Sequence, residues 1–220
     1  LRRGREEEAL HKFQTVLAMD LSNDEAYELF KNTEASIWLE MLTAEGDMET
    51  VTRRLMSMSK LRRMEQRDDA ETIRGLLRSI TGDDVSARLM AIRQMSSDHG
   101  EYAVQYMLPS LGDQTELDRR VLVMNALTSM GDDVVLPLCA ALDTPNAFLR
   151  RNVAVTLGYI GDSRAAAYLA RLAEGDADAG VKEQAAKALA SCGGAANGAE
   201  YAFLVMGREY HVASTSVLRP

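Results

Sequence analysis

The sequence predicts an all-α fold, a right-handed α-solenoid of antiparallel helix pairs, from three observations. Basic residues recur every 30 to 32 residues, at Arg88, Arg120, Arg150 and Lys182. Apolar residues follow them at the same spacing, at Met95, Leu127, Leu157 and Leu189. Aromatic residues make up only 5% of the chain, which favours helix-on-helix packing over sheets. Such a period indicates stacked helical repeats that present a long surface to a partner.

The composition excludes several classes of protein. The net charge of −8 disfavours nucleic-acid binding, which needs a basic face. No run approaches the roughly 18 apolar residues of a membrane span. Cys139 and Cys192 lie in apolar helical stretches and are expected to be buried free thiols. Because the chain begins at Leu1 rather than Met, we expect a fragment of a longer protein. Separately, the cytoplasm is the favoured compartment.

Residues 1–47 are predicted to form the first helices. Apolar residues at helical spacing are Ala9, Leu10, Phe13 and Leu17, and Asn23 or Asp24 is placed to cap the next helix. The segment resembles the second helix of a tetratricopeptide repeat and the start of the following unit. The residues that carry this resemblance are Gly4, Ala9, Phe13, Leu17, Asp20, Asn23 and Ala26.

A helical stripe is expected from Glu25 to Glu45, and residues 48–82 are expected to add a connecting helical pair. The inward side chains of the helix over residues 48–67 are predicted to be Val51, Leu55, Met58, Leu61 and Met64. Asp68 and Asp69 cap a second helix from Ala70 to Ile80, and a turn follows at residues 81–84.

Residues 83–220 are predicted to hold four units that continue one solenoid, at 83–114, 115–146, 147–179 and 180–211. Each has a helix, a tight turn, a second helix and an Asp-rich link. Gly131, Gly161 and Gly193 close the first helices of the last three units, where a left-handed residue lets the chain reverse. In the first unit, residues 97–100 (Ser-Asp-His-Gly) replace the Met-Gly-Asp turn.

These units resemble HEAT repeats, especially the short bacterial form seen in phycobilisome-lyase-like proteins. The residues that carry the resemblance are Leu149, Arg150, Ala154, Leu157, Gly161, Asp162, Ala165, Leu169, Leu172, Val181, Lys182, Ala185, Ala186 and Leu189. The resemblance implies that the basic column (Arg88, Arg120, Arg150 and Lys182) ties neighbouring repeats together. The alternative is that this column forms a binding edge for a partner.

The sequence predicts no catalytic residue, no cofactor and no metal site. His11, His99 and His211 lie far apart, and the chain lacks the His-Glu pairs that hold iron in HEAT-like deoxyhypusine hydroxylases. Trp38, the one tryptophan, lies outside the HEAT-like region, which disfavours an alkylpurine DNA glycosylase. Paired aspartates at turns are interpreted as helix caps. The methionines are interpreted as core filling, with an adaptable binding groove as the alternative.

The predicted function is a non-catalytic protein-binding scaffold, whose partner is another protein or another part of the same full-length chain. The alternative is a bilin (tetrapyrrole) lyase or chaperone-lyase, because those enzymes use the same type of repeat. The apolar segment 201–206 also makes a homo-oligomer possible through the C-terminal end.

Overall fold

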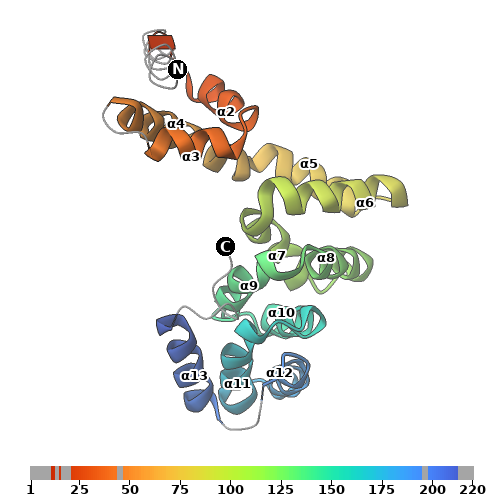
Figure 1. Cartoon of the computed structure of the whole chain (residues 1–220). Helices are drawn as coiled ribbons and strands as arrows, with labels where there is room; N and C mark the ends of the chain where they lie inside the picture. The colour runs from red at the N-terminus through yellow and green to blue at the C-terminus, as the bar shows by residue number, and fades with distance from the viewer. Residues whose placement is uncertain (1–10, 13–14, 16–20, 44–46, 195–197, 213–220) are drawn as a thin grey trace. The chain divides into compact units, whose positions relative to one another are not determined.

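Every secondary-structure element in the described part of the chain is helical (Figure 1). The structure is a computed structural model that describes residues 11–12, 15, 21–43, 47–194 and 198–212. The chain divides after Arg67 into two compact units, residues 1–67 (unit 1) and 68–220 (unit 2). The division falls inside the segment 48–82, so the two helices of that segment belong to different units.

Unit 1 contains α2 (Asn23–Lys31), α3 (Ala35–Thr43) and α4 (Asp47–Arg67), and α4 packs against the other two. The prediction that Asn23 or Asp24 caps α2 is wrong. Ser22 is the cap, because its hydroxyl accepts from the Glu25 amide while the Glu25 carboxylate accepts from the Ser22 amide. This reciprocal capping box satisfies two amide groups that the first helical turn leaves unpaired.

The core of unit 1 is small, and it includes Ala26, Trp38 and Leu55. The prediction that Leu61 and Met64 face inward is wrong, since both are exposed. The reason is the helix face: the buried residues of α4 follow one another every three or four residues from Met48 to Ser59, and Leu61 and Met64 lie on the opposite side of the helix. Most residues of the tetratricopeptide-like motif, from Gly4 to Asp20, lie outside the described residues. That resemblance therefore stays a prediction.

Unit 2 contains nine described α-helices joined by short turns and links. They are α5 (Ala70–Ile80), α6 (Val85–Gln94), α7 (Val104–Gly112), α8 (Leu117–Met130), α9 (Val135–Ala141), α10 (Ala147–Ile160), α11 (Ala166–Gly175), α12 (Ala179–Ser191) and α13 (Ala199–His211). Asp69 caps α5 and Asp84 caps α6, each by accepting two backbone amides, so these two predicted caps are confirmed. At the turn after α8, the N-cap residues Met130 and Val134 make no side-chain capping hydrogen bond, and the Asp132 backbone carbonyl accepts from Arg164.

The helices of unit 2 form an all-α solenoid in two layers (Figure 1). In one layer α6, α8, α10 and α12 stack in succession, and in the other α7 packs on α9 and α11 on α13. The helices joined by a polar link also pack side by side, namely α7 with α8, α9 with α10 and α11 with α12. The second-layer helices α7, α9 and α11 therefore each pack against the first-layer helix that follows them in the chain.

The repeating columns occupy the core and the turns. Met95, Leu127 and Leu157 have no exposed surface, and Leu189 packs partly buried against the same cluster. Gly131, Gly161 and Gly193 have φ angles of 70°, 72° and 72°. Such angles cost little only for glycine, so these residues allow the chain to reverse within a few residues.

In the first HEAT-like repeat, residues 83–114, the chain reverses direction through a longer turn. Its α6 helix runs on into one turn of π-helix (Met95–His99), and Gly100 with a φ of 52° then starts a short 3-10 turn. The π-helical turn adds one residue, and buried His99 then takes the place that buried Met130 has before Gly131, where the 3-10 turn Gly131–Val134 corresponds to Gly100–Ala103.

One helical run, residues 117–141, is long and apolar enough to cross a membrane by composition alone. It consists of α8 and α9, which Gly131 separates at a positive φ. Its apolar residues Val123, Leu127 and Leu138 lie in the core of unit 2. Packing within the protein thus accounts for the apolar character of this run.

We expect Leu157→Ala to lower the free energy of unfolding by about 2–5 kcal/mol, because it leaves a cavity in a fully buried position. Thermal and urea unfolding would measure the loss. Leu136→Ala, at an exposed position on α9, is the matched control. A Leu157→Ala variant that melts within about a degree of the wild type would show that this core register is wrong.

Candidate functional site

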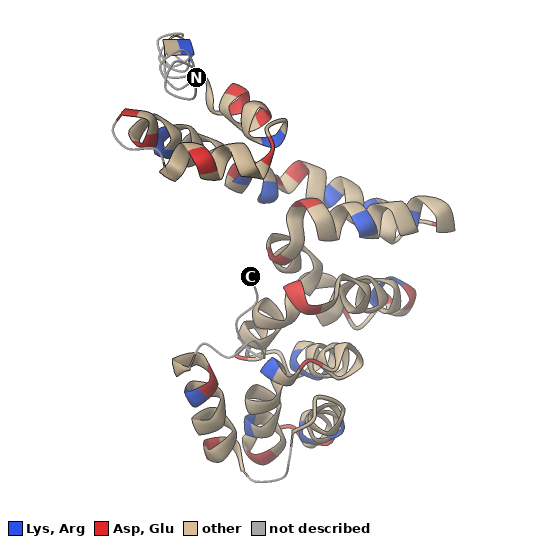
Figure 2. Ribbon diagram, in the orientation of Figure 1, with Lys and Arg blue, Asp and Glu red and all other residues tan. Residues whose placement is uncertain are grey.

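Aspartates of unit 2 concentrate in its turns and links, while lysine and arginine side chains come mostly from the helices (Figure 2). Arginines from the helix starts therefore lie next to acidic groups and free backbone carbonyls. At two places in the described part of unit 2, an arginine and its acidic partner lie beside a pocket. One is the turn after α10, and the other is the link between α11 and α12.

Arg164, in the short turn between α10 and α11, is a buried cation with only 8% exposure. Its Nε and Nη2 donate to the two carboxylate oxygens of Asp162, each at 2.9 Å. Nη2 also donates to the Asp132 carbonyl at 2.7 Å, in the turn after α8. The hydrogen bonds to Asp162 raise the pKa of Arg164 above its ordinary value, so the guanidinium keeps its charge at any physiological pH. Arg164 thus joins two successive turns of the solenoid.

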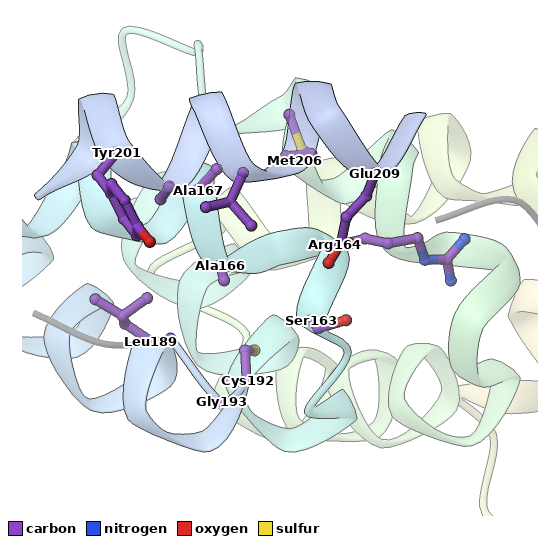
Figure 3. A pocket seen from close by; sticks show the side chains of 13 residues that line it. Ser163, Arg164, Ala166, Ala167, Leu189, Cys192, Gly193, Tyr201, Met206 and Glu209 are labelled. Carbon is purple, nitrogen blue, oxygen red and sulfur yellow. The ribbon is translucent and has the colours of Figure 1, made fainter. Parts of the chain in front are cut away.

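A cavity of about 250 Å³ lies beside Arg164, between α11, the end of α12 and α13 (Figure 3). Its apolar lining includes Ala166, Leu189, Val205 and Met206. Figure 3 shows the Glu209 side chain directed from α13 toward the Arg164 stem. A space of this size and lining suits an apolar group rather than a polar substrate.

The thiol that lines this cavity, Cys192, is buried. Cys192 donates a weak hydrogen bond to the Leu157 carbonyl at 3.5 Å, and burial raises its pKa to about 11. Burial also raises the pKa of Cys139 to about 12. Both cysteines are buried and unpaired, as the sequence predicts. A reactive cysteine needs a lowered pKa and access to solvent, so neither has the properties of a catalytic residue.

The basic column lies along the links of unit 2. Arg88 donates to the carbonyls of Ile80 and Gly82, at 3.0 and 2.6 Å, in the link before α6. Arg120 donates to the Asp113 carbonyl at 2.5 Å in the link before α8, and its guanidinium lies over the Phe148 ring of α10 at 4.9 Å. Arg120 therefore contacts both the preceding link and the following helix.

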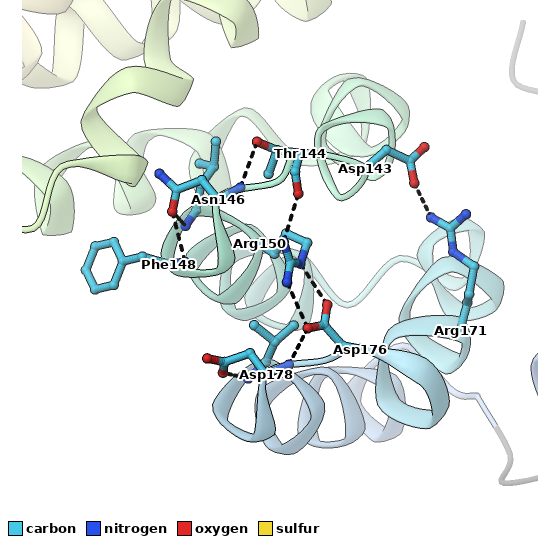
Figure 4. A network of polar contacts seen from close by, with 10 residues as sticks. Asp143, Thr144, Asn146, Phe148, Arg150, Arg171, Asp176 and Asp178 are labelled. Carbon is cyan, nitrogen blue, oxygen red and sulfur yellow. Dashed lines mark hydrogen bonds and ion pairs between the residues drawn. The ribbon is translucent and has the colours of Figure 1, made fainter.

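Arg150 makes the fullest set of contacts (Figure 4). Its Nη1 donates to the Thr144 carbonyl at 2.8 Å in the preceding link. Its Nε and Nη2 donate to the two carboxylate oxygens of Asp176 in the following link, at 2.7 and 2.8 Å. Asp176 also accepts from the Asp178 amide at 2.9 Å. One guanidinium thus fixes two links and the helix between them.

Lys182 differs from the three arginines. No hydrogen bond or ion pair of its ammonium group is found within the described residues, although its charge helps to lower the pKa of Asp176. The structure therefore places three members of the column on link carbonyls, which is the arrangement expected of a tie between repeats. The alternative role as a binding edge stays a prediction.

The histidines of unit 2 lie on different elements: His99 is buried in the turn after α6, and His211 is exposed at the end of α13. His11 is exposed and belongs to unit 1. Among the described residues, no three His, Cys, Asp or Glu side chains are grouped so that they could hold a metal ion. Within that part of the chain, the polar contacts tie links and turns of the solenoid together.

The stacked pairs and the periodic links define an α-solenoid protein. Residues 104–190, from the start of α7 to α12, match the family model of HEAT repeats, and this segment belongs to that family. No curated protein matches the chain. HEAT repeats generally mediate protein–protein interaction and are generally non-catalytic.

Arg164→Met should lower the free energy of unfolding by about 3–5 kcal/mol, because it leaves the Asp162 carboxylate buried without its cation. The double variant Arg164→Met/Asp162→Asn removes both charges and should recover part of this loss. Denaturant unfolding of both variants checks the expectation. A single variant as stable as the wild type would contradict it.

The Arg150–Asp176 pair should make unfolding pH-dependent in acid. The hydrogen bonds from Arg150 hold the pKa of Asp176 below its ordinary value in the folded chain. The pair therefore stabilises the folded chain above about pH 4, the pKa of an aspartate in the unfolded chain. This stabilisation is lost as the pH falls through the lower pKa of Asp176 in the folded chain. We expect Asp176→Asn to be less stable at neutral pH and to lose less stability between about pH 5 and 2. An unchanged profile, matching that of the exposed control Asp133→Asn, would exclude this role.

Proposed function

We propose that the chain is a non-catalytic scaffold that binds another protein through the outer surface of its HEAT-type solenoid. The observation that carries this proposal is an apolar patch on two successive first-layer helices. We call it the α6–α8 patch, and it consists of Val85, Leu89, Leu117 and Val121. All four side chains are between 44% and 59% exposed.

The repeat itself builds this patch. Val85 and Leu89 lie four residues apart on α6, and Leu117 and Val121 occupy the corresponding positions on α8. Residues four apart share one face of a helix, so each helix presents two apolar side chains to the same side. Because α6 and α8 stack on one another, the two pairs lie on neighbouring ridges of one surface.

Charged residues bound the patch. The position on α10 that corresponds to Val121 is the exposed Arg151, and one turn beyond Leu89 on α6 is the exposed Arg93. An apolar centre with a charged rim is the common arrangement of a protein interface. Exposed large apolar residues on a monomer typically mark such a surface when they are contiguous. The partner that fits is a protein segment with apolar side chains at its centre and acidic groups opposite Arg93 and Arg151.

The absence of enzymatic activity is part of this proposal. The raised pKa values of both thiols and the general non-catalytic character of HEAT repeats support it. The bilin-lyase alternative stays a prediction, and a shift in the absorbance of added bilin on mixing with the chain would support that alternative.

The double variant Leu89→Asp/Val121→Asp should lose its partner while keeping its fold. Both residues are exposed, so the melting temperature should change little, whereas binding should weaken at least about tenfold. Proteins captured by the wild-type chain are identified first, and their affinity for each variant is then measured by calorimetry. Leu136→Asp, at an exposed apolar position on α9, is the control. Equal affinity of the double variant and the control would refute the assignment of this surface.

A further inference from the structure

The cavity beside Arg164 is a slot that runs along α13. Figure 3 shows Tyr201 at one end of it and Glu209 beside Arg164 at the other. Tyr201, Val205 and Glu209 follow one another at four-residue steps on one side of α13, so the slot is about 12 Å long. Polar groups therefore lie at its two ends, while its middle is apolar.

The walls of this slot are held in place by contacts that do not fill it. The Glu174 carboxylate, at the end of α11, accepts a hydrogen bond from the Ala199 amide at 2.9 Å and so fixes the start of α13. The rings of Tyr168 on α11 and Phe203 on α13 meet edge to face, with their centroids 5.4 Å apart. These contacts anchor α13 on α11, and a cavity of about 250 Å³ lies between the two helices and the end of α12.

The sequence creates this space by using smaller residues than the preceding repeat. Three lining positions lose volume from one repeat to the next: Leu136 to Ala166, Pro137 to Ala167 and Ile160 to Cys192. Protein interiors have few spaces larger than a water molecule, because unfilled space forfeits packing contacts. A water molecule needs several polar partners, which the apolar middle of the slot does not offer. The slot therefore suits a molecule that replaces the absent apolar groups.

We propose that the slot binds an uncharged molecule with a single alkyl chain, of the type of a medium-chain alcohol. The apolar middle, which includes Leu189, Val205 and Met206, receives the chain. A hydroxyl group at the end of the chain finds hydrogen-bonding partners at either end of the slot, in Tyr201 or in Ser163 next to Arg164.

The charges near Arg164 decide the head group. Arg164 is already paired with Asp162, and their side chains are only 8% and 10% exposed. Glu209 adds a second carboxylate beside the Arg164 stem. An anionic head group would meet one cation and two anions there, and it would also give up its water on entering the slot. A hydroxyl group meets neither penalty, so the ligand is an alcohol rather than a fatty acid.

A molecule in this slot contacts α11, α12 and α13 at once. It supplies the packing for which the preceding repeat has larger side chains at Leu136 and Ile160, so it fastens α13 to its neighbours. Binding to the folded chain alone also stabilises that chain in proportion to the logarithm of the ligand concentration. The slot lies on other helices than the α6–α8 patch, and this inference does not depend on that patch.

The test is a titration of the isotopically labelled chain with octanol, followed by NMR. One molecule should bind with a dissociation constant on the order of 0.1–1 mM, as expected for a ligand of this size. The shifts should concentrate at the amides of Ala167, Gly193 and Ala202. Octanoate, which has the same chain length and a negative head, should bind at least about tenfold more weakly. Hydrogen exchange of the α13 amides should slow when octanol is bound.

Two variants fill the slot from different walls with side chains of the preceding repeat. Ala166→Leu fills it from α11 and Cys192→Ile from the end of α12, and each should weaken octanol binding at least about tenfold. Ala140→Leu adds the same side chain at an exposed position on α9, so this matched control should bind like the wild type. Thermal unfolding checks that each variant is folded.

A wild-type chain that shows no saturable binding overturns the proposal, and so do shifts that concentrate away from the slot. Octanol affinity that is the same in a folded slot-filling variant and in Ala140→Leu also overturns it. Octanoate that binds as tightly as octanol contradicts the assignment of an uncharged ligand.

Discussion

No helix of unit 2 can bury its apolar side chains alone, and the rest of the structure depends on this constraint. A helix such as α10 presents Val153, Ala154 and Leu157 on one side, and only its neighbours in both layers can cover them. The chain must therefore reverse direction quickly, so that the next helix arrives where it is needed. Glycines at positive φ meet this requirement at Gly131, Gly161 and Gly193, because any other residue there would be strained.

Apolar packing brings the helices together but does not fix the angle between them, and the arginines of the links supply that geometry. Arg150 holds Thr144 in one link and Asp176 in the next, with side chains that are 14% and 6% exposed for Arg150 and Asp176. A planar guanidinium accepts little distortion, so its fork fixes the relative position of both links. Arg164 does the same for the turns on the other side of the layers, through Asp162 and the Asp132 carbonyl.

Periodic features could be predicted from the sequence, and features that occur once could not. The column from Met95 to Leu157, the positive-φ glycines and the limits of α5 follow from spacing and from residues with strong local preferences. The role of Arg164 was not predicted from the sequence. The corresponding position in the previous repeat is Val134, and a repeat pattern does not mark a residue that occurs only once. The sequence signal that would have found it is an arginine two residues after a Gly-Asp turn, within an otherwise apolar stretch. The outward direction of Leu61 and Met64 was missed because the buried stripe of α4 includes the polar residues Thr52 and Ser59, which a search for apolar residues passes over.

The two buried thiols can report which part of the solenoid opens, because each one becomes accessible only when the helices around it separate. Cys139 lies in α9, in the middle of unit 2, while Cys192 ends α12 near the last described helix. In a stack in which each repeat contacts only its neighbours, distant parts can open independently of one another. Because neither sulfur reacts while it is covered, a thiol reagent modifies each one only when its own part of the stack separates. The order in which the two cysteines are modified would then show which of these two parts of the stack separates first.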